Sequence, residues 1–144
     1  QEAHFIFQGG VDFVPKPKYF FDQEGKIVSL RPGIKVGIFS GISNPKLFRE
    51  MVDSLGVEVV AEWRLADHQK GEEAQLKTFS SNCKSAGCEL ILTTEKDFIK
   101  ISLPATFSLS IIWIEIELQL TGDGKDKWEK LVATIEEKLY HHTL

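Results

Sequence analysis

Two spacings of apolar residues alternate along the chain from Ile34 onward. Short apolar runs predict strands, and apolar residues that recur every three or four positions predict helices. The strands are expected at residues 35–40, at 57–60 with an extension toward 65, at 89–93 and at 112–120. The helices are expected at residues 45–55, at about 72–85, as a short segment from 95, and over a last segment carrying Trp128, Leu131, Val132, Ile135 and Leu139. This alternation predicts an α/β fold with a Rossmann-like, mostly parallel sheet of about four strands, flanked by helices.

The predicted strands differ in how their apolar residues are arranged. Residues 36–39 and 90–92 are apolar at nearly every position, as in strands that are buried on both faces at the centre of a sheet. Residues 112–120 instead alternate isoleucine or leucine with Trp113 and polar residues. We therefore expect the strand at 112–120 to bury one face and to lie near a sheet edge.

Several helix ends carry sequence signals. Asn44 is a good N-cap, Pro45 suits the first helical position, and Gly56 is a C-terminal stop. Thr94 can cap a short helix that begins at Glu95, because its hydroxyl can accept a hydrogen bond from an amide three residues on. Helices are therefore expected to start directly after the strands at 35–40 and 89–93.

The N-terminal residues 1–34 differ from the rest of the chain. They hold three of the five prolines and scattered phenylalanines. Residues 18–21 and 26–30 favour strands and flank the turn-forming segment 22–25, which predicts a β-hairpin. We therefore divide the chain into an N-terminal arm with a hairpin, residues 1–34, and an α/β domain, residues 35–144.

Composition and charge narrow the class of protein. The chain has 144 residues, 42% of them apolar, which suffices for one globular core. Seventeen Lys and Arg against 21 Asp and Glu give a formal net charge of −4, so a DNA-wrapping protein is excluded and no nucleic-acid partner is expected. No apolar run approaches the roughly 20 residues of a membrane span. Because the sequence begins at Gln1 without a signal peptide, we expect a piece of a longer protein.

The two cysteines, Cys83 and Cys88, are too few for a disulfide framework or a four-ligand zinc site. Their spacing is also not that of a redox pair. We expect reduced thiols in a cytoplasmic protein, buried as small apolar side chains. His141 and His142 would point about 100° apart on a helix, so no metal site is predicted there.

Candidate chemistry concentrates in loops that follow strands, because ligands of open α/β sheets bind beyond the carboxyl ends of the strands. In the first loop, residues 40–44, Gly41 either presents helix amides to an anion or only makes a tight turn. In the second, residues 66–69, His68 beside Asp67 either relays a proton or is an ordinary polar surface residue.

The third loop, residues 93–97, has two interpretations. Either Lys96 holds a phosphate while Glu95 or Asp97 orients a base, or the residues only cap the following helix and place carboxylates favourably at its start. Elsewhere, Glu115 and Glu117 share one face of a strand, either as a carboxylate pair or as a solvated edge.

The chain contains no phosphate-binding P-loop. Gly-Lys occurs at residues 25–26 and 124–125, but Ile27 and Asp126 follow where the P-loop motif needs Ser or Thr.

Four motifs follow one another along the chain. They are Gly-Ile-Ser-Asn-Pro at 41–45 with Phe48, Leu-Ala-Asp-His-Gln at 65–69, Thr-Thr-Glu-Lys-Asp at 93–97, and Leu-Gln-Leu-Thr-Gly-Asp at 118–123. In this order and at these spacings they resemble the C-terminal portion of the tetraacyldisaccharide 4'-kinase family of lipid A biosynthesis. The resemblance runs from about Tyr19 to Leu139.

The resemblance implies a P-loop kinase that transfers the γ-phosphate of ATP, with Mg²⁺, to the 4'-hydroxyl of a tetraacyldisaccharide 1-phosphate. It implies a location at the cytoplasmic face of the bacterial inner membrane, with peripheral membrane contact through the full-length protein. In this family the P-loop, the magnesium-binding residues, the catalytic aspartate and the membrane-docking helix belong to an N-terminal domain. Residues 35–144 would then be the C-terminal lid domain, the hairpin its two-stranded linker, and the chain inactive alone.

The resemblance also matches Asp67 and His68 to the Asp-His pair of the family. It implies that His68 partners the catalytic aspartate of the other domain when the domains close. Gln69 stands where family members often carry a second histidine, so a mechanism with two imidazoles is not implied. Residues 93–97 match closely, but no catalytic role is carried over to them.

Two other functions stay open from the sequence. One is a free-standing Rossmann-like module that binds a nucleotide or a phosphate at residues 41–44. The other is a structural domain whose loops only shape an interface. The aromatic-rich residues 5–21 are expected to rest either on the N-terminal domain or on lipid.

Overall fold

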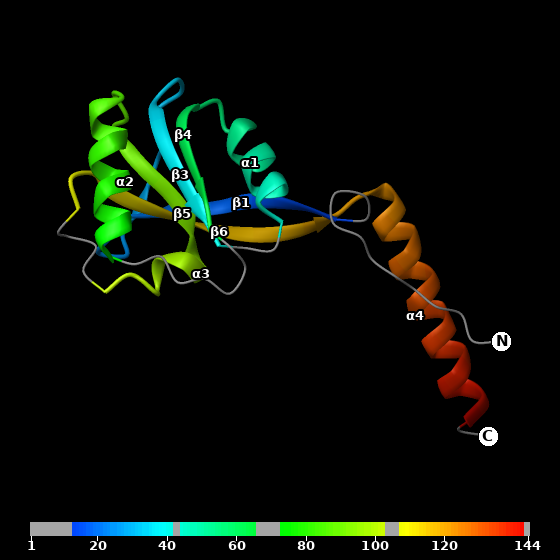
Figure 1. Cartoon of the computed structure of the whole chain (residues 1–144). Coiled ribbons are helices and arrows are strands. Elements are labelled where there is room, and N and C mark those ends of the chain that lie inside the picture. The colour runs from blue at the N-terminus through cyan, green and yellow to red at the C-terminus, as the bar shows by residue number, and fades with distance from the viewer. Residues whose placement is uncertain (1–12, 42–43, 66–72, 103–106, 143–144) are drawn as a thin grey trace. The chain divides into compact units, whose positions relative to one another are not determined.

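The computed structural model describes residues 13–41, 44–65, 73–102 and 107–142 (Figure 1). In chain order the elements are β1 (Phe13–Phe21), β2 (Ile27–Val28), β3 (Lys35–Ser40), α1 (Pro45–Asp53), β4 (Glu58–Arg64), α2 (Glu73–Ser85), β5 (Leu90–Thr94), α3 (Glu95–Phe98), β6 (Ser110–Leu120) and α4 (Gly122–His142). Each strand and helix expected from the spacing of apolar residues is confirmed, with small shifts at the ends.

The chain forms two compact units. The larger unit is Pro17–Glu117, and the smaller one combines Gln1–Lys16 with Leu118–Leu144 and contains α4. This division does not test the predicted boundary at residue 34, which stays a prediction.

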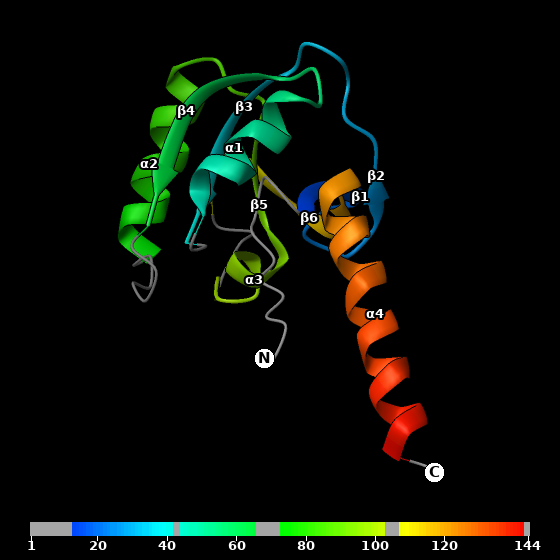
Figure 2. The same ribbon diagram turned by 90° about the vertical axis from the view of Figure 1, so that its right-hand side faces the viewer.

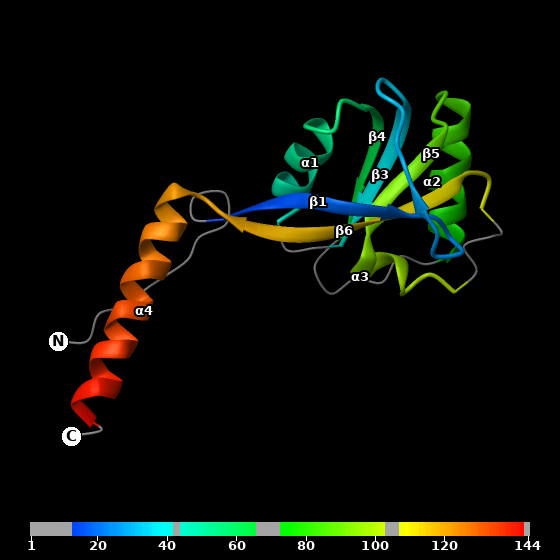
Figure 3. The same ribbon diagram turned by 180° about the vertical axis from the view of Figure 1, so that it is seen from behind.

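The strands form one sheet in the order β2-β1-β6-β5-β3-β4. β3 is parallel to β4 and to β5, and β5 is parallel to β6. β1 and β2 form the predicted antiparallel hairpin, and β1 runs beside β6 in the opposite direction (Figure 3). The mostly parallel α/β fold with an N-terminal hairpin is therefore confirmed. The sheet has six strands where about four were expected, because the hairpin joins the same sheet.

The predicted position of the strand at 112–120 near a sheet edge is wrong. β6 lies between β1 and β5, because the hairpin adds β1 on its outer side. Ile112 and Ile114 do bury one face, as expected. On the opposite face Trp113 stacks on Phe21 of β1, with ring centroids 4.2 Å apart, and lies 6.1 Å from the ring of Phe98. The alternation in β6 thus reflects a hydrophobic cluster on one face and aromatic contacts of Trp113 on the other.

Two hydrophobic clusters cover opposite faces of the sheet. On one face the buried residues of α1, Phe48, Met51 and Val52, pack with strand residues such as Val36 and Ile38. On the other face Leu76 and Cys83 of α2 pack with strand residues such as Phe39, Ile91 and Ile111. Figure 2 shows the two helices on either side of β3 and β4. Because the two clusters cover both faces of β3 and β5, residues 36–39 and 90–92 of these strands are apolar at nearly every position.

The helix α2 approaches β3 closely at Gly37. A Cβ added to Gly37 would lie only 2.5 Å from the sulfur of Cys83. Cys83 and Cys88 are both free and buried, which confirms the expectation of buried thiols. Burial, with a smaller contribution from Cys88, raises the pKa of the Cys83 thiol to about 12.

A β-bulge in β4 changes the face of the sheet toward which its side chains point. Val36 pairs with Val59, but the next residue, Gly37, pairs with Ala61, so Val60 is an extra residue. As a result Val59 packs on the α1 side, whereas Ala61 and Trp63 pack on the α2 side.

The smaller unit contains the last predicted helix, α4. Of its apolar stripe, Trp128 is 52% exposed and Ile135 is 48% exposed. Leu131 and Val132 are half-buried. The side chain of Leu139 lies outside the described residues.

Candidate functional site

The order of the parallel strands defines one position where a ligand crevice is expected. From β3 the chain crosses to β4 on one side, and then returns to β5 on the other side of β3. Ligands of such sheets bind outside the carboxyl ends of the strands where the direction of winding reverses. Here those ends are Ser40 of β3 and Thr94 of β5, which belong to two of the three candidate loops.

Asp97 connects these two strand ends. Its side chain belongs to α3, directly after β5, and is 4% exposed. Its Oδ2 accepts a hydrogen bond from the amide of Gly41 at 3.0 Å and one from the hydroxyl of Thr94 at 2.6 Å. The structure therefore brings together Gly41 and Asp97, which belong to separate candidate loops.

Both threonines of the motif at 93–97 are buried and hydrogen-bonded. Thr94 is the N-cap of α3, because its Oγ1 accepts from the amide of Asp97 at 3.1 Å. The hydroxyl of Thr93 donates to the carbonyl oxygen of Phe39 in β3 at 2.9 Å. The capping interpretation of this loop is confirmed, and the motif also ties β5 to β3.

The end of β4 belongs to the same group of contacts. The amide of Leu65 donates to the carbonyl oxygen of Ser40 at 2.8 Å. A Cβ added to Gly41 would lie 3.1 Å from Oδ1 of Asp97 and 3.5 Å from Cβ of Leu65. Gly41 is thus packed between a carboxylate and a leucine, so its lack of a side chain serves close packing at the strand ends.

The other predicted site residues have different surroundings. Glu95 and Lys96 are exposed on α3, Glu117 is exposed and Glu115 is half-buried. Asn44 caps α1, as expected, by accepting from the amide of Leu47 at 3.2 Å. Asp67 and His68 lie outside the described residues, so their predicted role stays a prediction. Their segment follows Leu65 at the carboxyl end of β4.

Sequence reasoning missed an ionic group on the α1 side of β4. Arg49 donates to Glu62 at 2.9 Å and to Asp53 at 3.0 Å, and Arg64 donates to Glu62 at 2.8 Å. Burial alone would raise the pKa of Glu62, but the hydrogen bonds from Arg64 and Arg49 lower it below its ordinary value. Of these three ion pairs, only Arg49–Asp53 has the i to i+4 spacing that predicts an ion pair on one helix face from the sequence.

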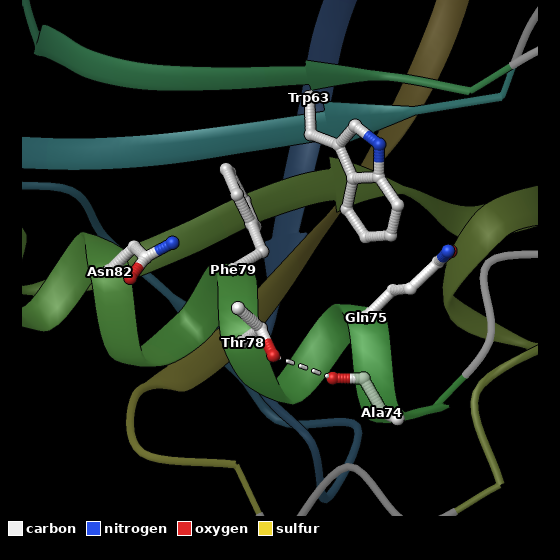
Figure 4. A pocket seen from close by; sticks show the side chains of 6 residues that line it. All are labelled: Trp63, Ala74, Gln75, Thr78, Phe79 and Asn82. Atoms are coloured by element: carbon white, nitrogen blue, oxygen red, sulfur yellow. Dashed lines mark hydrogen bonds between the residues drawn. The ribbon is translucent and has the colours of Figure 1, made fainter.

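Sequence reasoning also missed a groove between β4 and α2. It has a volume of about 530 Å³ and is lined by Trp63, Ala74, Gln75, Thr78, Phe79 and Asn82 (Figure 4). The rings of Trp63 and Phe79 are 5.7 Å apart and tilted by 49°, and Thr78 donates to the carbonyl oxygen of Ala74. The bulge in β4 places Trp63 on this side, which no sequence signal reveals. The lining is aromatic and uncharged, so it offers no charged group for phosphoryl chemistry.

The described residues offer no site for a metal ion, because no group of three or more His, Cys, Asp or Glu is placed to hold one. Within the same part of the chain, no helix has both the length and the hydropathy that crossing a bilayer requires.

The fold and the tied strand ends define the class of protein: an α/β domain with a reversal of winding between β3 and β5. A family model described as "Tetraacyldisaccharide-1-P 4'-kinase" matches residues 13–136. The match covers most of the chain, and the chain belongs to this family, as the four motifs implied.

Relatives of the chain carry the same description. It is 33% identical over 88 residues to a tetraacyldisaccharide 4'-kinase of Syntrophus aciditrophicus, covering 61% of the chain and 24% of that protein. It is 31% identical over 108 residues to one of Afipia carboxidovorans, covering 73% of the chain and 32% of that protein. The chain thus spans about a quarter of the first of these curated relatives and about a third of the second.

A solved structure, LpxK from Aquifex aeolicus in complex with ATP, is 19% identical, with a TM-score of 0.43. The similarity covers 85% of the chain and 35% of that structure.

Proposed function

We propose that this chain is the C-terminal domain of a kinase that phosphorylates the 4'-hydroxyl of a tetraacyldisaccharide 1-phosphate with the γ-phosphate of ATP. The match of the family model to residues 13–136 is the observation that carries this proposal. The chain spans only 24% and 32% of the two relatives, so most of such a kinase lies outside it.

ATP and Mg²⁺ would be bound by a P-loop domain outside this chain. The chain has no P-loop motif, and its described residues hold no cluster of metal ligands. Magnesium-bound ATP would supply the phosphoryl group there, and the chain alone is expected to be inactive. The present residues do not fit either group, so no step at the nucleotide is assigned to them.

Asp67 and His68 are the residues through which this chain would act on the reaction. Their segment leaves the sheet at Leu65, whose amide is bonded to the end of β3 beside the expected crevice. An imidazole titrates near neutral pH, so His68 can orient or tune the base that accepts the proton of the sugar hydroxyl. Phosphoryl transfer depends mainly on positioning and charge stabilisation, which suits a residue brought in by domain closure.

The acceptor in this proposal is a lipid with acyl chains. Such an acceptor suits a kinase that works as a peripheral protein at a membrane, and the resemblance to the family implies the cytoplasmic face of the bacterial inner membrane. Membrane contact would come from the full-length protein, since no described helix has the length and hydropathy of a span.

The test is phosphoryl transfer from ATP to tetraacyldisaccharide 1-phosphate by the full-length kinase, comparing wild type, His68→Ala and His4→Ala. His4 is a matched control, because it is a histidine outside the four motifs. We expect His68→Ala to lower kcat by about 10²-fold with little change in KM, and His4→Ala to leave both unchanged. Full activity of His68→Ala would remove the catalytic role and leave a scaffold domain. No activity in wild type would contradict the proposed reaction itself.

The second candidate, a free-standing nucleotide- or phosphate-binding module at residues 41–44, is disfavoured by one contact. The amide of Gly41 already donates to the carboxylate of Asp97, so it is not free for a phosphate oxygen, and the carboxylate repels an anion. Calorimetric titration of the chain with ATP and with inorganic phosphate should therefore give no binding heat.

A further inference from the structure

We propose that Asp97 is a positioning residue, whose carboxylate fixes the strand ends from which the segment with Asp67 and His68 leaves the sheet. Its effect on turnover rests on the proposed function, because it assumes that His68 acts in phosphoryl transfer. Its effect on the strand ends depends only on the contacts of the described residues.

Asp97 is an unusual carboxylate. It is 4% exposed, and the part of the chain that the structure describes contains no ion pair with it. Burying a carboxylate without a cation is unfavourable unless hydrogen bonds replace its hydration. Here an N–H and an O–H converge on Oδ2, from Gly41 and from Thr94. Hydrogen bonds to a charged acceptor are stronger than neutral ones, which makes this a firm connection between the ends of β3 and β5.

Capping of α3 does not explain the carboxylate. The capping hydrogen bond runs from the backbone amide of Asp97 to Oγ1 of Thr94, so any residue at position 97 other than proline could supply it. The side chain of Asp97 instead reaches Gly41, 56 positions earlier in the chain. Besides its contact with Thr94 at the start of its own helix, the carboxylate therefore acts on β3.

The effect of Asp97 extends from β3 to β4. Gly41 lies between the carboxylate and Leu65, since an added Cβ would be 3.1 Å from Oδ1 and 3.5 Å from Cβ of Leu65. The neighbouring carbonyl of Ser40 accepts the amide of Leu65 at 2.8 Å. A shift of Gly41 would therefore shift Leu65, the last described residue before the segment that carries Asp67 and His68.

The kinetic test compares Asp97→Ala with Glu95→Ala in the full-length kinase. Both donors meet one oxygen, which asparagine would keep as an acceptor, so alanine is the variant that removes the connection. Glu95 is a matched control, because it is an exposed carboxylate on the same short helix and its substitution removes the same group. We expect Asp97→Ala to lower kcat by about 10²-fold with the KM for ATP unchanged, since misplacing a catalytic group by about 1 Å has effects of that size. Glu95→Ala should keep wild-type values. A kcat of Asp97→Ala that equals that of Glu95→Ala, even with a lower Tm, would overturn the proposal.

A second measurement does not depend on kinase activity. Amide hydrogen exchange of the 144-residue chain should become faster at Gly41 and Leu65 in Asp97→Ala. It should be unchanged at Leu109, whose amide donates to Ser80 far from these strand ends. Unchanged exchange at Gly41 and Leu65 would overturn the proposal, even if wild type proves to have no kinase activity and the proposed function fails.

Gly41→Ala provides an independent test if Asp97→Ala does not fold. The added methyl would meet Oδ1 of Asp97 at 3.1 Å and displace the carboxylate without removing it. The carboxylate must give way by only a few tenths of an ångström, so we expect a smaller fall in kcat than for Asp97→Ala, with faster exchange at Leu65. Wild-type values for both in a folded Gly41→Ala protein would contradict the proposal.

Discussion

At position 83 a thiol is enclosed between α2 and β3. Its sulfur lies where Gly37 leaves no side chain in the way, and Cys88 is buried beside it. The charged thiolate is strongly disfavoured in such surroundings, so burial raises the pKa of Cys83 to about 12. Thiolates are the reactive form, which makes these two cysteines inert while the protein is folded.

Thiol labelling should follow unfolding. At pH 8 we expect 5,5'-dithiobis(2-nitrobenzoic acid) to react with Cys83 and Cys88 in urea within minutes and to leave the native protein unmodified over the same time. Because the folded pKa of Cys83 is raised, its contribution to stability is present below the ordinary thiol pKa and is lost as pH rises toward about 12. Cys83→Ala should weaken this loss in urea unfolding curves at increasing pH. Rapid labelling of the native protein would contradict the assignment.

Among the elements, β1 is held to the sheet by aromatic contacts as well as by strand pairing. Phe21 stacks on Trp113 of β6, and Tyr19 makes an edge contact with Phe21 at 6.2 Å. Phe20, on the other face, packs against the cluster that α1 covers. The hairpin is therefore part of the folded sheet and not a loose arm.

Phe21→Ala should destabilise the chain more than Tyr19→Ala. The first variant removes the 4.2 Å stack on Trp113, whereas Tyr19 is 44% exposed. We expect a loss of about 1–2 kcal/mol in the free energy of unfolding for Phe21→Ala, and about 0.5 kcal/mol or less for Tyr19→Ala. Urea denaturation followed by circular dichroism measures both. Equal effects of the two variants would show that the stack on Trp113 does not hold β1.

Local sequence signals predicted the helices and strands well. The order and register of the strands depend on pairing between distant segments and were predicted less well. Asn44, Pro45 and Thr94 marked helix starts because caps act within a few residues, and the structure confirms them. The pairing of β1 with β6 joins segments nearly a hundred positions apart, so the alternation in 112–120 was interpreted as an edge strand. The bulge at Val60 depends on the register between two strands and leaves no mark in the sequence.

The candidate site was predicted in part. The candidate chemistry was expected in the loops beyond the carboxyl ends of the strands, and Gly41 and Asp97, from two of these loops, do meet there. The direction of the Asp97 side chain toward β3 could not be predicted, because a carboxylate at the start of a helix that Thr94 caps already had a local explanation. The contact of Arg49 with Glu62 and the groove beside Trp63 depend on tertiary packing alone.

For the whole molecule, the chain passes from one compact unit to the other twice, between residues 16 and 17 and between 117 and 118. Both buried clusters belong to Pro17–Glu117. The larger unit therefore contains the interactions that a cooperative core needs.

A truncated chain of residues 17–117 should fold alone, with a single cooperative thermal transition. A second truncation, residues 35–117, should have a clearly lower Tm, because it lacks Phe20, Val28 and Leu30, which pack against the α1-side cluster, and the stack of Phe21 on Trp113. Circular dichroism melting curves of the two chains make the comparison. Equal Tm values would favour the boundary at residue 34 that the sequence suggested.

The close approach of Gly37 to Cys83 has a consequence for how this sequence can evolve. Alanine at position 37 would meet the sulfur of Cys83 at 2.5 Å, but Cβ of Cys83 only at 3.5 Å, which is an ordinary contact. A methyl group at 37 is therefore harmful while position 83 is cysteine and tolerable once position 83 has become alanine. The two positions are epistatic: a lineage can enlarge residue 37 only after it has reduced residue 83, so the order of the two mutations decides which path is open.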